Sequence, residues 1–414
     1  MASFNLTNFD AAMKHMYPYK KVENMVYQNN PLLAMIPKNT KFPGKNATFA
    51  VEYGLTNGRS ATFQTAQNNR SGTSLAEFVV TRVKDYAVVS VDNETLLAAD
   101  GNEGSLLDVA KSKTDSALHA LSRAMGRDIY RSGTGSIGQV HASTFTGAGT
   151  TLVLVDGHGV NFEVGMRLKA SATDGSALYD GVLEVTAISG DTLTTNVNLT
   201  VGIPDLSVDD FFYVEGDGSG STTALTKMAG LDAWIPSTVG SGAFFGLDRT
   251  AHATRLGGQR ESYATAVHDT IIKAAVRTSR EGGRPDAMFI NPTDWAELAL
   301  DLEGRAAVAG ANNRRRYDPK DKAGIFGFSS ISIATPTGMV DVFADHNCPI
   351  NVGYLLQLDT WELKSLGPAP RLLDFDGLKG IRQSNEDGVE YRWGYYGNLI
   401  CKAPGFNCRV ALAA

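Results

Sequence analysis

The sequence predicts an α+β protein whose separate modules are arranged around one long helix. Residues 103–132 have helical periodicity, the chain before them alternates as β-strands do, and residues 145–222 contain only short strand patterns. The apolar positions of the helical segment share one face: Leu107, Ala110, Ala117, Leu121 and Ala124. Such a helix would be roughly 40 Å long, which is more than a compact domain needs to close a core.

The composition limits the class of protein. The chain has 414 residues, which suggests about two to three domains. No apolar run approaches the roughly 20 residues needed to span a bilayer, and the N-terminus lacks a secretory signal pattern. We therefore expect the protein to stay in the cytoplasm in which it is made. A formal net charge of -6 argues against tight binding to nucleic-acid phosphates, so any DNA contact should be local and weak.

Residues 1–40 form an apolar N-terminal arm. Three prolines, Pro18, Pro31 and Pro37, prevent a long helix there. The apolar content is nevertheless high for a tail, and it includes Phe4 and Phe9. The arm could pack on its own domain or lie on a neighbouring subunit, and the sequence favours neither alternative.

Residues 41–90 predict a long β-hairpin that protrudes as a flap. The alternating run TFAVEY at 48–53 is answered by a second run, AEFVVTRVKDYAVVSV, at 76–91. The polar connection between them is far longer than the two to five residues of a compact hairpin. Exposed strand edges on such a flap would favour pairing with another chain.

A GxGxxG pattern follows the predicted helix at Gly133, Gly135 and Gly138. A dinucleotide site needs these glycines after a strand and at the start of a helix, where backbone amides meet the pyrophosphate. Here the pattern follows a helix and leads into a β-rich block, so a helix-terminating loop is the better interpretation. A nucleotide-dependent enzyme that uses residues 133–138 is the weaker alternative.

Residues 145–222 predict an inserted β-barrel or sandwich that ends in a flexible GDGSGSTT linker. Turn signals separate its short strand patterns, as at Asp156-Gly157, Asp174-Gly175 and Gly190-Asp191. The many aspartates lack the DxDxDG spacing of a calcium loop, so we interpret them as turn residues.

Residues 226–355 return to a mixed α/β pattern. We expect a helix over 259–280, a buried strand in PDAMFINP, a short helix in DWAELALDLEG, and strands in ISIAT, MVDVFAD and GYLLQLDTWEL. The adjacent residues Arg314, Arg315 and Arg316 mark either a solvated loop or a loop that contacts a subunit or phosphate. The C-terminal segment alternates again and should return to the sheet of the long helix.

No catalytic or metal-binding constellation stands out. The seven histidines form no HExxH motif, and neither a GxSxG elbow nor a GxxxxGK[ST] loop occurs. His346 and Cys348 could supply at most half of a metal site, and Cys401 has no adjacent histidine to activate it, which favours a buried thiol. We therefore expect no enzyme activity, no metal and no cofactor.

The order of these modules resembles the major capsid protein of tailed bacteriophages, which has the Hong Kong 97 type fold. Three stretches are similar to parts of that family: PDAMFINPTDWAEL to the axial domain, GYLLQLDTWEL to the strand that leaves it, and GNLICKAPGFNCRVALA to the closing strand of the peripheral domain. The resemblance covers nearly the whole chain except residues 145–220. It depends on the ordered set of modules rather than on one motif.

The resemblance implies a division of the chain and a set of partners. The division is an N-arm (1–40), a flap or E-loop (41–90), a peripheral domain (91–144) with a spine helix (104–131), the β-insertion (145–222), an axial domain (226–355) and a return to the peripheral domain (356–414). The family's subunits assemble through hexamers and pentamers into an icosahedral shell around double-stranded DNA. A separate scaffolding protein, a portal and a decoration protein are the implied partners, and a virion assembled in the bacterial host cytoplasm is the implied location.

The resemblance also indicates where subunits should touch. The expected contact residues lie in the arm, the flap and the arginine loop: Phe4, Phe9, Arg59, Phe63, Arg70, Arg314, Arg315 and Arg316. Some members cross-link a flap lysine to a distant asparagine, but here no lysine lies between Lys45 and Lys84, so we expect no such bond. An encapsulin, a cellular compartment of the same fold, is the nearest alternative.

Overall fold

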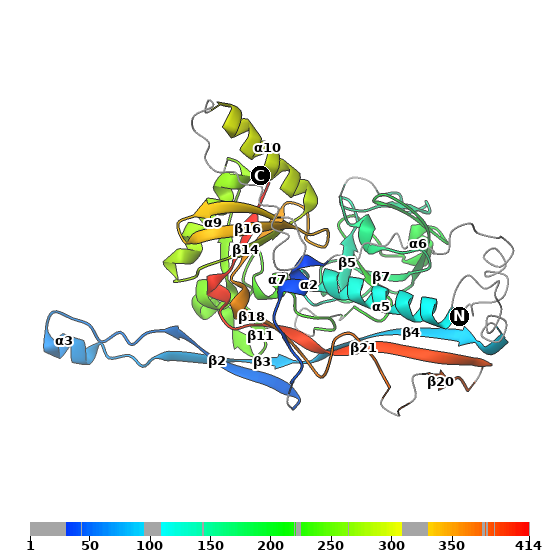
Figure 1. Ribbon diagram of the computed structural model, residues 1–414, viewed down its shortest axis with the longest axis horizontal. Coiled ribbons are helices and arrows are strands. Elements are labelled where there is room, and N and C mark those ends of the chain that lie inside the picture. Colours follow the sequence, from blue (N-terminus) through cyan, green and yellow to red (C-terminus); the bar gives the residue numbers. More distant parts are fainter. Residues whose placement is uncertain are drawn as a thin grey trace.

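The computed structural model describes residues 30–42, 44–94, 109–142, 145–218, 220, 225–263, 265–308, 330–374, 377, 380–384 and 386–413, with backbone only at 109–112 and 303–308. The molecule is elongated, with a hairpin that projects from one end and a barrel near the other (Figure 1). Within these ranges, no helix is both long and apolar enough to span a membrane.

A six-stranded sheet around β21 (Gly388–Cys401) forms the platform of the molecule. β21 pairs antiparallel with β4 (Val83–Asp92) along the whole length of β4. The other strands are β18 (Trp361–Ser365), β19 (Arg371–Leu372), β20 (Ile381–Arg382) and β1 (Lys38–Asn39), which pairs parallel with β18 after the short helix α2 (Pro31–Met35).

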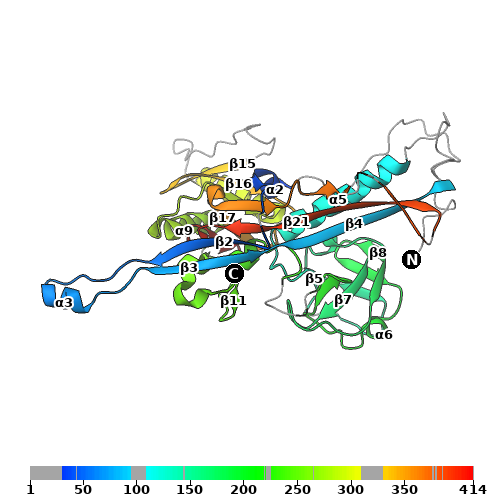
Figure 2. The same cartoon turned by 90° about the horizontal axis from the view of Figure 1, so that it is seen from below.

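Helix α5 (Val109–Asp128) lies along β4 and β21, as Figures 1 and 2 both show. Its buried face contains Ala117 and Leu121, which the periodicity predicted, and continues through Met125 to Ile129. Residues 95–108, which include the N-terminal part of the predicted helix, lie outside the described part of the chain. The long helix is therefore confirmed from Val109 to Asp128.

The flap is a two-stranded hairpin of β2 (Asn46–Gly54) and β3 (Ser74–Thr81). We expected one continuous partner strand over 76–91, and this was wrong, because the chain changes partner at Arg82: β3 pairs with β2, whereas β4 pairs with β21. The inward-facing positions shift there from Phe78 and Val80 to Val83, so the two strands bury opposite phases of the alternation.

A second six-stranded sheet has the order β13-β22-β17-β14-β16-β15. Its strands are β13 (Gln259–Glu261), β22 (Cys408–Ala411), β17 (Val352–Leu356), β14 (Ala287–Ile290), β16 (Gly338–Ala344) and β15 (Ser330–Thr335). Helices α9 (Val267–Arg280) and α10 (Pro292–Val308) pack against this sheet and against each other. Short turns complete the region: η2 (Arg249–His252), α8 (Ala253–Gly257), η3 (Leu358–Thr360) and η4 (Pro404–Phe406).

Three expectations for this region need correction. The helix expected from Gln259 starts at Val267, because residues 259–261 are extended and pair with β22. The run GYLLQLDTWEL forms two strands, β17 and β18, which are separated by η3 and belong to different sheets. The last strand, β22, joins the second sheet and does not return to the platform, because it is paired between β13 and β17.

The insertion is a small antiparallel barrel with its own core. Its strand order is β5-β10-β7-β8-β9-β6, and a bridge between Val140 and Leu154 joins the two ends. The strands are β5 (Ser136–Gln139), β6 (Thr151–Val153), β7 (Arg167–Ser171), β8 (Leu183–Ser189), β9 (Thr192–Thr195) and β10 (Phe211–Val214), with short helices η1 (Gly159–Asn161) and α6 (Leu199–Gly202). The barrel thus begins at β5, earlier than the expected residue 145.

Aromatic side chains fix the base of the hairpin to the rest of the molecule. Trp234, at the end of α7 (Leu231–Trp234), lies 5.2 Å from the ring of Phe78 in β3 and 5.0 Å from that of Phe244. Phe244 belongs to a small hairpin of β11 (Ala243–Phe244) and β12 (Leu247–Asp248), and the carbonyl of Phe245 accepts a hydrogen bond from the amide of Val79 at 2.9 Å. The direction of the flap is therefore set by packing at its base.

Replacing Trp234 with alanine should lower the free energy of unfolding by about 3–5 kcal/mol, because a fully buried indole leaves a cavity. The change also removes the hydrogen bond from the indole Nε1 to the carbonyl of Leu399, 3.1 Å long. Urea unfolding measures the loss of free energy of unfolding. It is followed by far-ultraviolet circular dichroism, because the change removes a tryptophan. The matched control is Leu300→Ala, whose side chain is 67% exposed and which should change stability by less than about 0.5 kcal/mol. Equal losses in the two variants would contradict the packing role of Trp234.

Candidate intersubunit surfaces

The hairpin tip, residues 55–73, brings three of the predicted contact residues together. Phe63 begins the short helix α3 (Phe63–Asn68), and its side chain is 79% exposed. Arg59 and Arg70 are also exposed, and Leu55 at the start of the tip is 77% exposed. The other predicted contact residues lie outside the described part of the chain: Phe4, Phe9, Arg314, Arg315 and Arg316.

The tip has a defined shape without a core of its own. α3 buries none of its six residues, although an isolated helix shorter than about 12–15 residues is marginal in water. Polar contacts hold the tip: Arg70 Nε donates to the carbonyl of Gln67 at 3.0 Å, and the amide of Asn57 donates to Ser71 Oγ at 2.9 Å. An ordered, uncovered apolar surface of this kind is typical of a segment that packs on another molecule.

A second uncovered surface lies on β4, and it was not predicted from the sequence. Tyr86 and Val88 are 48% and 55% exposed on the face of β4 away from its buried residues Val83 and Val91. The ring of Tyr86 lies 6.0 Å from that of Tyr396 on the adjacent strand. The signal was present in the run KDYAVVSV, whose two alternating faces are both apolar, as in strands covered on both sides.

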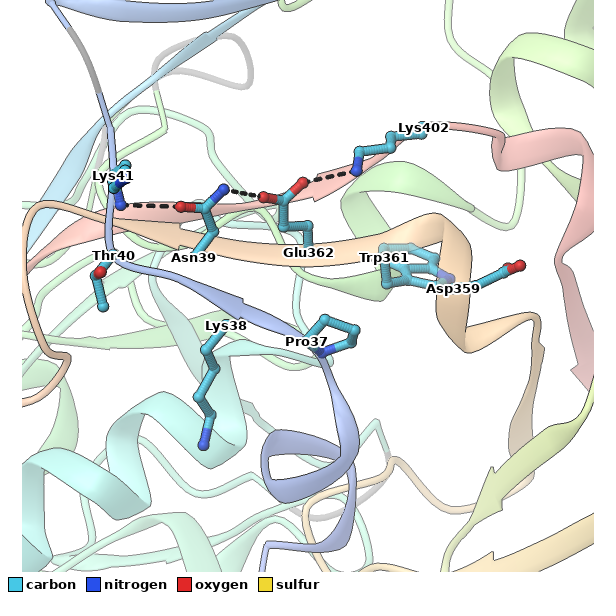
Figure 3. Close-up of a pocket in the computed structure, with 9 residues that line it drawn as sticks. All are labelled: Pro37, Lys38, Asn39, Thr40, Lys41, Asp359, Trp361, Glu362 and Lys402. Carbon is cyan, nitrogen blue, oxygen red and sulfur yellow. Dashed lines mark hydrogen bonds and ion pairs between the residues drawn. The ribbon is translucent and has the colours of Figure 1, made fainter.

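A shallow polar depression lies where β1 joins the edge of the platform (Figure 3). Glu362 lies at its centre and accepts a hydrogen bond from Asn39. It also forms an ion pair with Lys402, with 2.8 Å between Lys402 Nζ and Glu362 Oε2. Burial favours the neutral acid, but the hydrogen bonds from Lys402 and Asn39 outweigh it and lower the pKa of Glu362. The charged group thus fastens residues 38–41 to the platform.

The junction of the barrel with the platform contains a buried ion cluster. Lys227 Nζ lies 2.8 Å from a carboxylate oxygen of Asp85 in β4 and 3.0 Å from one of Asp217 at the end of the barrel. Burial alone would lower the pKa of Lys227, but these two carboxylates outweigh it and raise the pKa above its ordinary value. On the other side, Ser132 Oγ donates to Asp174 at 2.5 Å, which ties α5 to the barrel.

Replacing Lys227 with methionine should lower the free energy of unfolding by about 3 kcal/mol, because it leaves Asp85 and Asp217 without their cation. The matched control is Lys402→Met, which removes an ion pair whose lysine side chain is 58% exposed and should cost less than about 1 kcal/mol. Thermal unfolding of the two variants at one ionic strength gives the comparison. A loss no larger for Lys227→Met than for Lys402→Met would show that the buried cluster does not hold the junction.

The glycine pattern has a structural role. Gly133 and Gly135 have positive φ values of 85° and 95°, and they turn the chain from the segment after α5 into β5. Gly138 lies in β5 against the ring of Phe162, at a distance that leaves no room for a Cβ atom. A phosphate at this loop would face the carbonyl end of α5, not the amide end that binds anions.

Other predicted groups are also explained by packing. Cys348, Cys401 and Cys408 are buried free thiols, and burial raises the pKa of each, so they are held as unreactive thiols. Asp191 accepts hydrogen bonds from the backbone amides of Gly157 and Gly159, and Asp210 accepts one from the amide of Ser207. Among the residues that the structure describes, no three His, Cys, Asp or Glu side chains gather as a metal site would require.

The fold corresponds to that of a phage capsid subunit. The chain superposes on the cyanophage A-1(L) capsid asymmetric unit with a TM-score of 0.56 at 12% sequence identity, over 99% of both chains. The match shows that the chain has the Hong Kong 97 type capsid fold, as the order of its modules predicted. No protein-family model and no curated protein sequence matches the chain.

Two further solved structures are more distant. The holo-SrpI encapsulin complex from Synechococcus elongatus PCC 7942 is 8% identical, covers 100% of this chain and 96% of its own, and has a TM-score of 0.49. The capsid of the native GTA particle is 10% identical over 100% of both chains, with a TM-score of 0.46. Both superpose too loosely to refine the assignment.

Proposed function

We propose that this chain is the major capsid protein of a tailed bacteriophage, a structural subunit that assembles with copies of itself into an icosahedral shell around double-stranded DNA. The observation that carries the proposal is the hairpin tip, which projects from a capsid fold with Leu55 and Phe63 exposed and no core beneath α3. Such a tip becomes stable when a neighbouring subunit covers it.

The shape of the subunit supports assembly by heterologous contacts. A projecting element at one end can pack on the body of the next subunit, and this contact is heterologous when it repeats in one direction. Repeated around an axis, this contact closes rings, and we assign hexamers and pentamers to it. Residues 226–355, with the second sheet, would lie at the ring centres, and the platform with α5 would lie at the periphery.

The charge of the chain fits a container for DNA. A net charge of -6 leaves little attraction for phosphates, so packaged DNA would touch the wall only by weak, non-specific contacts. A scaffolding protein, a portal and a decoration protein would be supplied by other chains, and the assembled virion would form in the host cytoplasm. No catalytic role is assigned to any residue.

An encapsulin shell, a cellular compartment, is the alternative within the same fold. The two functions differ in what the shell encloses and in its diameter. The inserted barrel at β5–β10 and the apolar segment before residue 30 favour the phage subunit, because encapsulins usually lack both.

The proposal predicts that the protein expressed alone forms rings, tubes or closed shells tens of nanometres across. Size-exclusion chromatography with negative-stain microscopy measures this. Replacing residues 55–73 with a short Gly-Ser turn should abolish the particles yet leave the folded subunit, because the removed segment buries no residue of α3. Particles that form equally well without the tip would contradict its role, and a wild-type chain that stays a compact monomer or dimer at micromolar concentration would contradict the function itself.

A further inference from the structure

The charge of this chain is divided unequally between its modules. Residues 145–218, the barrel, contain eleven Asp and Glu residues but only two Lys and Arg residues, a net charge of -9. Since the whole chain carries -6, the remainder carries +3. Two barrels therefore repel each other, and a barrel attracts other parts of a second copy.

One end of the barrel combines this charge with exposed apolar side chains. We call it the acidic face and define it by Asp180, Glu184, Val197, Val201 and Asp205. Val201 in α6 is 69% exposed and Val197 is 37% exposed, and all three carboxylates are on exposed residues. No ion pair engages these three carboxylates within the described part of the chain.

Backbone contacts hold the acidic face together. Gly181, next to Asp180, packs so tightly on the carbonyl of Gly202 at the end of α6 that a Cβ there would lie 1.9 Å from the oxygen. The amide of Glu184 donates to Asn196 Oδ1 at 3.1 Å, which places Glu184 beside Val197. These contacts bring two separate stretches of the barrel, residues 180–184 and 196–205, into one surface.

The hairpin tip has the complementary chemistry. Between Glu52 and Glu77 the chain contains no acidic residue, whereas Arg59 and Arg70 are both exposed on the tip. Leu55 and Phe63 add an apolar surface beside these two charges. The tip is therefore cationic and apolar, and the acidic face is anionic and apolar.

We propose that the acidic face receives the hairpin tip of a second copy of this chain. The two surfaces cannot meet within one molecule, because α3 and α6 lie at opposite ends of its long axis in both views (Figures 1 and 2). A contact between them is head to tail, with arginines against carboxylates and Phe63 against the valines of the barrel. This inference rests on the proposed function and adds to it the surface that accepts the flap.

Disulfide trapping in the full-length chain tests the contact. The variant Phe63→Cys with Val201→Cys should form a ladder of linked multimers on mild oxidation, since the native thiols are buried. The matched control is Phe63→Cys with Val164→Cys, because Val164 is 63% exposed on the same barrel but follows Glu163, which pairs with Arg123 of α5. Its ladder should be at least about tenfold weaker, because only an interface raises the effective concentration of two thiols.

The outcomes separate this inference from the proposed function. If wild-type shells form but the Val201 variant cross-links no better than the Val164 control, the tip docks elsewhere, and the inference fails while the capsid function stands. If the wild-type chain forms no multimer, both fail. A ladder specific to Val201, lost when assembled particles are dissociated before oxidation, supports both.

A charge swap gives an independent test. Arg59→Glu with Arg70→Glu should raise the subunit concentration needed for assembly by at least about tenfold, because attraction becomes repulsion at the acidic face. Adding Asp180→Lys and Glu184→Lys to that variant should restore assembly, whereas adding Asp156→Lys, at an exposed carboxylate elsewhere on the barrel, should not. The proposed contact would be overturned if assembly were restored by both of these additions or by neither of them.

Discussion

The pairing of β4 with β21 is the interaction on which the rest of the structure depends. It joins residues far apart in sequence, from Val83 opposite Gly397 to Asp92 opposite Gly388. The same two strands carry α5 on one face, and β4 continues the chain from β3 of the hairpin. The flap therefore extends from a base that is held by a long strand pair and by the helix packed on it.

In this arrangement a single chain buries its hydrophobic clusters but leaves other apolar side chains exposed. The barrel completes a hydrophobic cluster of its own. One face of the second sheet packs against α9 and α10, and its other face shares a cluster with the platform and α5. Three surfaces remain exposed: the hairpin tip, the outer face of β4 at Tyr86 and Val88, and the barrel surface at Val197 and Val201. A subunit with closed cores and apolar extremities is suited to gain its remaining burial from its neighbours.

Local patterns in the sequence predicted helices and strands well. The pairing of strands that lie far apart in the sequence could not be predicted. Periodicity identified α5 and the buried strand β14, and turn signals identified the strands of the barrel, because these features depend on neighbouring residues. The partner of β4 could not be predicted, since the same alternation fits β2 or β21 equally well. The C-terminal strand β22 was assigned to the wrong sheet for the same reason.

The same difference between local and long-range features applies to the candidate surfaces. Loop length predicted a protruding tip, and the resemblance to the capsid family indicated Arg59, Phe63 and Arg70 on it as contact residues. The acidic face could not be identified from the sequence, because Asp180, Glu184 and Val201 become neighbours only when the loops of the barrel pack. The excess of acidic residues over 145–218 was visible, but which of them share a surface with Val197 and Val201 required the fold.

The central claim is that the hairpin tip is completed by another subunit. Hydrogen exchange of the backbone amides in residues 55–73, compared between assembled particles and dissociated subunits, tests it most directly. The account predicts fast exchange in the dissociated subunit and exchange slowed at least about tenfold in the particle, since only a partner can shield these amides. Equal exchange in the two states, whether fast or slow, would contradict it.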